Sequence, residues 1–175
     1  EVKYQNSRGK ANIISNTSLN NDTGMRLASI SKTFTALAIM QFVETGAMAL
    51  EDPIDMYIPE LSSSWSMITI HHLLSHQSGI PDFQNDWWDK EWLNGLSNAG
   101  IVEYFASNPS LEFMPGTQTQ YSNSGYVLLS EVISRITGEA FADYMRSSLF
   151  EPLGMDDSYI IDETDDILDK DALNF

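Results

Sequence analysis

The sequence predicts an α+β fold that is mainly helical and contains only a small piece of sheet. Helical apolar patterns cover residues 27–45, 126–136 and 140–149, whereas a strand pattern covers only Ala11–Ser15. The chain has 175 residues, of which 42% are hydrophobic, so it can build a real core. We therefore expect residues 1–175 to belong to a single domain.

The segment 27–45 gives the strongest helical signal. Ile30, Phe34 and Leu37 lie on one side of this helix, and further apolar residues widen the surface beyond one stripe. A helix that is apolar on most faces is expected to be buried in the core. Gly46 follows it and suits its C-terminal cap.

Cap and breaker residues predict where the other helices begin and end. Thr69 can cap a short helix that Gly79 and Pro81 terminate. A helix over 99–106 stops before Asn108-Pro109, and Gly138 separates the last two helices. Three tryptophans in the stretch 83–92 suggest packed loop or helix, or else the aromatic wall of a cleft: Trp87, Trp88 and Trp92.

The charge balance excludes two classes of partner. The chain carries 9 Lys+Arg against 25 Asp+Glu, for a formal net charge of −16. Binding to nucleic acid or to an anionic membrane needs a positive patch, so neither is expected. No apolar run is long enough to span a membrane. The acidic stretch 151–171 lacks the pattern of a calcium loop and is interpreted as a solvated surface.

Metal and cofactor chemistry has little support. The chain has no Cys, which excludes disulfides, a thiol nucleophile and Cys-ligated metal sites. His71, His72 and His76 lack zinc-site spacing; His72 and His76 could meet on a helix face, but no carboxylate stands at a standard third-ligand offset. No Gly-x-Ser-x-Gly elbow supports a Ser-His-Asp triad. We therefore expect neither a metal nor a cofactor.

The sharpest local feature is Ser29-Ile30-Ser31-Lys32, at the start of the helix 27–45. A spacing of three places Ser29 and Lys32 on one helical face. The positive field of a helix N-terminus favours a developing alkoxide on the serine, and a lysine one turn on can help to take its proton. On its own, the pattern is equally that of a serine that caps a helix.

A second feature, Tyr121-Ser122-Asn123, lies between a Pro-Gly loop and a predicted helix. A tyrosine beside a lysine ammonium loses its proton more readily and can serve as a general base. The Asn123 amide offers a donor and an acceptor to a substrate amide. The alternative is a turn with a packed tyrosine and an asparagine that bonds its own backbone.

Together these segments resemble the serine hydrolases of the class C β-lactamase and penicillin-binding-protein family, in its DD-peptidase and esterase branch. Residues 26–36 resemble the nucleophile helix, and residues 73–81 (LLSHQSGIP) resemble an "LLTHTSGIP" element. Residues 115–117 with 121–126 resemble the second catalytic block, and 151–155 resemble a "PLGM" turn. The resemblance runs from about residue 11 to about residue 162, and four ordered blocks make it specific.

The resemblance implies a β-lactamase/transpeptidase-like fold, with an α/β sheet and an all-helical subdomain. Ser29 would attack a carbonyl and become acylated, with its N–H as half of the oxyanion hole, and Lys32 would assist proton transfer. Tyr121 would act as base and then as acid, and Asn123 would bond the amide of the substrate. The implied substrate is a β-lactam, a D-alanyl peptide or an ester, and the implied location is periplasmic or extracellular.

One departure leaves alternatives open. The third block of the family, Lys-Thr-Gly or His-x-Gly on a sheet strand, does not occur in this sequence. We therefore expect the front portion of such a domain, shortened at its N-terminal side and incomplete at its C-terminal side. A non-catalytic module that recognises cell-wall peptide or a partner protein is the alternative function, although a module of that kind has no need of all four site residues. A third possibility is an inert helical fragment that folds poorly.

Overall fold

The structure, a computed structural model, describes residues 3–61, 65–83 and 97–161. Trp87, Trp88 and Trp92, for which the sequence left packing and a cleft wall open, lie outside the described residues. So do the acidic residues from 162 onward. The elements in chain order are β1 (Lys10–Asn12), β2 (Thr17–Ser18), η1 (Ala28–Ile30), α1 (Ser31–Glu44), η2 (Ile54–Met56), α2 (Ile70–Leu74), α3 (Asn98–Ser107), α4 (Asn123–Thr137), α5 (Phe141–Met145), η5 (Arg146–Phe150) and η6 (Glu151–Leu153).

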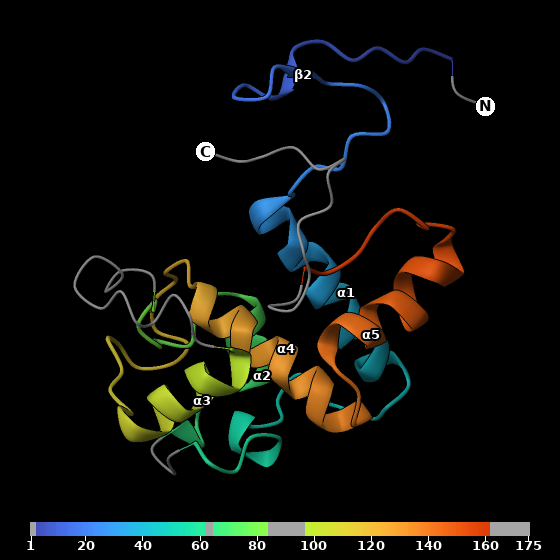
Figure 1. Cartoon of the computed structure of the whole chain (residues 1–175). Helices are drawn as coiled ribbons and strands as arrows, with labels where there is room; N and C mark the ends of the chain where they lie inside the picture. Colours follow the sequence, from blue (N-terminus) through green and yellow to red (C-terminus); the bar gives the residue numbers. More distant parts are fainter. Residues whose placement is uncertain (1–2, 62–64, 84–96, 162–175) are drawn as a thin grey trace.

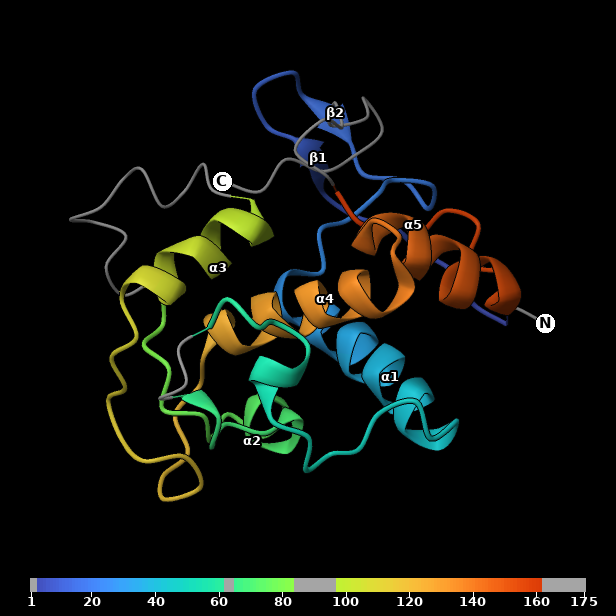
Figure 2. The ribbon, with the colours of Figure 1, turned by 90° about the horizontal axis from the view of Figure 1, so that it is seen from below.

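Helix α4 is the central element, and it packs against α1, α2, α3 and α5 (Figures 1 and 2). The Ser122 hydroxyl accepts a hydrogen bond from the Gly125 N–H at 3.3 Å and so caps its N-terminus. Gly138, with φ of 71°, ends the helix in the left-handed conformation. The helix therefore begins three residues before the predicted start at residue 126, and it carries Asn123 in its first turn.

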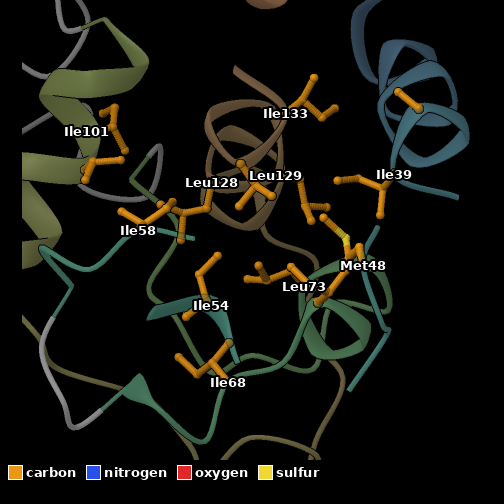
Figure 3. Close-up of a cluster of buried hydrophobic side chains, with 14 of the residues drawn as sticks. Ile39, Met48, Ile54, Ile58, Ile68, Leu73, Ile101, Leu128, Leu129 and Ile133 are labelled. Atoms are coloured by element: carbon orange, nitrogen blue, oxygen red, sulfur yellow. The ribbon is translucent and has the colours of Figure 1, made fainter. Parts of the chain in front are cut away.

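The hydrophobic core surrounds α4. Leu128, Leu129 and Ile133 of this helix are fully buried, and Figure 3 shows them between side chains from α1, α2, α3 and the loops. The same view shows the buried side chains of Ile39 from α1 and Leu73 from α2. Each fully buried aliphatic side chain contributes about 1.5–3 kcal/mol. The core thus fixes α1 and α2 against α4.

Helix α1 is buried on one side only, which corrects the prediction of an all-round buried helix. Its buried residues are Thr35, Ala38 and Ile39. Leu37 and Met40 remain 45% and 41% exposed. The physical reason is that α4 packs against one side of α1, where α5 adds the contact of Tyr144 with Phe42. An apolar composition does not show which faces other elements cover.

The sheet is a two-stranded antiparallel hairpin, β1 with β2, that lies apart from the helices (Figure 1). The predicted strand Ala11–Ser15 is wrong beyond Asn12. The Asn12 side chain accepts a hydrogen bond from the Ser15 N–H at 3.0 Å, and Asn16 adopts a positive φ of 58°. These local bonds turn the chain instead of extending it.

Two further predicted boundaries are wrong. The α-helix predicted from residue 27 begins at Ser31, after the 3-10 turn η1. The helix that Gly79 and Pro81 were expected to end stops at Leu74, and His76 beyond it adopts a positive φ of 59°, which a helix does not contain.

The Thr69 hydroxyl accepts from the His72 N–H, and the His72 ring accepts from the Thr69 N–H, which confirms Thr69 as the cap of α2. Ser97 caps α3 with a single hydrogen bond, which its hydroxyl accepts from the Gly100 N–H. The predicted helix 140–149 instead changes after Met145 into a π-helical turn. Among the described residues, no helix has the length and apolar character needed to cross a membrane.

Gly79 is expected to be far less tolerant of alanine than Gly138. Both glycines have a positive φ, 75° and 71°. A Cβ at Gly138 meets nothing within 4 Å, so Gly138→Ala should cost only the left-handed strain of about 1–2 kcal/mol. A Cβ at Gly79 would overlap the Phe113 carbonyl oxygen, adding about 1–3 kcal/mol. Urea unfolding of both variants measures the difference, and equal losses would contradict the overlap.

Candidate active site

Ser29 is the middle residue of η1, two residues before the start of α1 at Ser31, and it is exposed. The residue before it, Ala28, has a positive φ of 46°, a strained conformation for alanine. Lys32 follows in the first turn of α1, and its Nζ donates to the Ser29 Oγ at 3.3 Å. The predicted proximity of these two side chains is therefore present in the structure.

Tyr121 joins this pair from a segment 92 residues away in the sequence. It directly precedes Ser122, so the capped start of α4 fixes its backbone. The phenol hydroxyl donates to the Ser29 Oγ at 2.6 Å, and the Lys32 Nζ lies 4.9 Å from the centre of the phenol ring. Ser29 Oγ thus accepts from a phenol and from an ammonium at the same time.

The same contacts alter the acidity of the phenol. Lys32 lowers the pKa of Tyr121, the hydrogen bond with Ser29 lowers it further, and burial and the Asp82 charge act in the opposite direction. A lowered pKa increases the fraction of phenolate near neutral pH, because the ammonium stabilises the anion. The electrostatics therefore suit a tyrosine that takes a proton from Ser29.

Asn123 also belongs to this cluster, but it has partners that the sequence did not indicate. Its amide oxygen accepts from the Lys32 Nζ at 2.7 Å, and its amide nitrogen donates to Asp82 at 2.9 Å. The predicted contact with the amide of a substrate stays a prediction. Within the protein, Asn123 links the ammonium of Lys32 to a buried carboxylate.

His76 is a further neighbour whose place the sequence did not predict. Its Nδ1 accepts from the Ser122 N–H at 3.2 Å, and its ring centre lies 4.7 Å from that of Tyr121 and 5.3 Å from that of Tyr126. Burial, and then the Lys32 charge, lower the pKa of His76. The lowered pKa favours the neutral imidazole, and Nδ1 as an acceptor leaves its proton on Nε2, while the ring packs against the phenol of Tyr121.

The histidines do not form the helical pair that their spacing allowed. Helix α2 ends at Leu74, and His76 lies beyond it with a positive φ of 59°, so His72 and His76 share no helix face. Within the part of the chain that the structure describes, no group of three His, Asp or Glu side chains is placed to hold a metal ion.

The effect of Lys32 on the pKa of Tyr121 can be measured without any substrate. Lys32→Met should move the pKa of Tyr121 upward toward its ordinary value, because the main cause of its lowering is removed. Tyrosinate absorbance, with the Tyr121 signal assigned by a Tyr121→Phe variant, measures the change. Lys10→Met is the matched control, since Lys10 lies on the hairpin and bonds Ser18 and Asn16. The same shift in both variants would contradict the assignment.

Comparisons with known proteins give consistent relatives. A family model described as Beta-lactamase matches residues 1–169. A penicillin-binding protein of Bacillus subtilis (strain 168) is 33% identical and covers 91% of this chain and 36% of its own length. The esterase EstB of Burkholderia gladioli is 33% identical, and the match covers 90% of this chain and 43% of the esterase. The structure of a D-amino acid amidase from Ochrobactrum anthropi SV3 superposes with a TM-score of 0.79 at 29% identity. The match covers 95% of this chain and 49% of the amidase. The chain therefore spans less than half the length of each relative.

Proposed function

Because the chain belongs to the beta-lactamase family, we propose that it acts as a serine hydrolase that forms an acyl-enzyme on Ser29. The family also confirms the predicted fold class, of which the described residues contain the helical part and a small sheet. The observation that carries the proposal is the convergence on the Ser29 Oγ of the Tyr121 hydroxyl at 2.6 Å and the Lys32 ammonium at 3.3 Å. A serine needs such neighbours to become a nucleophile.

Acylation begins with a proton transfer. In the described state the Tyr121 phenol donates to Ser29, so it must first lose its proton, which its lowered pKa favours. The phenolate then takes the Ser29 proton as the Oγ forms a bond to the substrate carbonyl carbon. The carbonyl π electrons move onto the oxygen, and the Ser29 N–H is the proposed donor to that oxyanion. The Lys32 ammonium holds the Oγ in place throughout.

Collapse of the tetrahedral intermediate completes the step. The carbon–oxygen double bond re-forms, the bond to the amine or alkoxide breaks, and the leaving group takes the proton that Tyr121 received from Ser29. The product is acyl-Ser29 with Tyr121 again a phenolate. Water then attacks the ester carbonyl while the Tyr121 phenolate takes one of its protons. As the bond between the acyl carbon and the Ser29 Oγ breaks, Tyr121 returns that proton to the Oγ, which releases a carboxylic acid and restores the serine. Proton and electron count balance without a metal or cofactor.

The proposed substrate class is a carboxylic acid derivative: a β-lactam, a D-alanyl peptide or an ester. The relatives include a penicillin-binding protein, an esterase and a D-amino acid amidase. Attack on a carbonyl carbon is the chemistry proposed for all three substrates. The described site supports that shared chemistry because Ser29 and Tyr121 are both exposed to an approaching acyl group.

The test is covalent labelling of this chain with three probes: benzylpenicillin, a p-nitrophenyl ester and a D-alanyl thioester. Intact mass spectrometry is expected to show one acyl group per chain with at least one probe, and peptide mapping is expected to place it on Ser29. The probe that reacts fastest identifies the substrate class. Labelling elsewhere, or no labelling with any probe, would overturn the proposal for this chain and favour the non-catalytic module.

A further inference from the structure

Asp82 is a buried carboxylate that the sequence motifs did not single out. It lies in the loop after α2, and only 6% of the residue is exposed. Its Oδ2 accepts two hydrogen bonds from Asn123, one from the main-chain N–H and one from the side-chain amide, each at 2.9 Å. Burial of a carboxylate is costly unless such donors satisfy it. Packing alone therefore does not explain why a carboxylate is buried at residue 82.

The partners of Asn123 dictate the orientation of its amide. A carboxylate only accepts hydrogen bonds and an ammonium only donates them. With Asp82 on one side and Lys32 on the other, the amide nitrogen must face Asp82 and the amide oxygen must face Lys32. A flipped amide would make two repulsive contacts. Asp82 thus selects the one orientation in which Asn123 accepts from Lys32.

The loop that carries Asp82 is fastened to the same end of α4. The Ser124 hydroxyl, fully buried, donates to the Pro81 carbonyl at 2.7 Å and accepts from the Phe83 N–H at 2.9 Å. These bonds hold the residues on both sides of Asp82. Asp82 also accepts from a main-chain N–H in the first turn of α4, where a negative charge is favourable. The carboxylate is therefore held rigidly against Asn123.

We propose that Asp82 is a positioning residue for the acylation reaction, which acts through Asn123 to hold the Lys32 ammonium against Ser29 and Tyr121. The inference rests on the proposed function and deepens it. Three hydrogen bonds form the path: Asn123 to Asp82, Lys32 to Asn123, and Lys32 to Ser29. Asp82 itself touches none of the reacting atoms.

The charge of Asp82 also reaches the titrating groups of the site. It raises the pKa of Tyr121 and that of His76, whereas the Lys32 charge lowers both. Among the described residues, Lys32, Tyr121 and His76 are thus charged or titratable groups of the site that lie near this carboxylate. Removal of the negative charge, with the hydrogen bonds kept, should make Tyr121 lose its proton at a lower pH. The rise of the acylation rate with pH should then begin at lower pH.

Two variants separate charge from orientation. Asp82→Asn removes the negative charge but keeps an oxygen that can accept from Asn123. The pKa of Tyr121 should therefore fall, and acylation should slow only modestly. Asp82→Ala removes the acceptor and frees the amide, and misplacement of the lysine should slow acylation by about 100-fold. Asp143→Asn is the charge-matched control, since Asp143 pairs with Arg146 on the surface. It should leave both the titration and the rate unchanged.

The readouts are tyrosinate absorbance of Tyr121 and the rate of Ser29 labelling as a function of pH. The absorbance titration needs no catalysis, so it tests Asp82 even if Ser29 does not react. An unshifted Tyr121 titration in Asp82→Asn would overturn the proposal. A folded Asp82→Ala that acylates at the parent rate would also overturn it, and if that variant fails to fold, the isosteric Asp82→Asn decides.

Discussion

Replacement of Ser29 by alanine is expected to abolish covalent labelling by every probe that acylates the parent chain. The Oγ is the atom that forms the acyl bond, and no other group in the described cluster combines a hydroxyl with both a phenol at 2.6 Å and an ammonium at 3.3 Å. The fold should be retained, because the Ser29 side chain is exposed. The expected change in the free energy of unfolding is below about 1 kcal/mol.

Ser31→Ala provides the matched control for that result. Ser31 lies two residues further along, is also exposed, and begins α1. Its loss should leave the labelling rate within a few-fold of the parent, whereas Ser29→Ala shows no mass increase over the same time. Circular dichroism and urea unfolding of both variants check that the fold is kept. A Ser29→Ala chain that is still acylated would refute the nucleophile assignment.

Local rules in the sequence account for most of the helix boundaries. Thr69 and Gly138 act within a few residues of their own position, so their capping is readable without tertiary information. The pairing of Ser29 with Lys32 is equally local, since one helical turn brings them together. The resemblance to the family then adds Tyr121 and Asn123. Local rules alone could not have predicted that these residues lie beside Ser29 and Lys32.

The roles of Asp82 and His76 could not be read from the sequence. Each acts through contacts 41 to 46 residues away, Asp82 with Asn123 and His76 with the Ser122 N–H. The only signal for Asp82 was an acidic residue placed between Pro81 and Phe83 in an otherwise apolar turn. The partial exposure of α1 was missed for a related reason, because the packing of distant elements decides which apolar face is covered.

Tyr121→Phe is expected to slow acylation by about 100- to 10,000-fold, the usual contribution of a general base, while probe binding changes much less. Phenylalanine keeps the ring, whose centre lies 4.7 Å from that of His76 in a tilted contact and 4.9 Å from the Lys32 ammonium. It removes only the hydroxyl that bonds Ser29. The increase of the acylation rate with pH that results from ionisation of the Tyr121 phenol should be absent in this variant.

Tyr126→Phe separates this base from a tyrosine of similar surroundings. The Tyr126 ring also lies near Lys32, at 5.6 Å, and near His76, but its hydroxyl donates to the Leu74 carbonyl at 3.1 Å instead of to Ser29. Its loss should cost about 1 kcal/mol of stability and leave acylation within a few-fold of the parent. Stopped-flow or quenched labelling at several probe concentrations gives the acylation rate and the binding constant separately. Equal losses of rate and binding in Tyr121→Phe would identify Tyr121 as structural, whereas a loss confined to the rate assigns it the proton transfer.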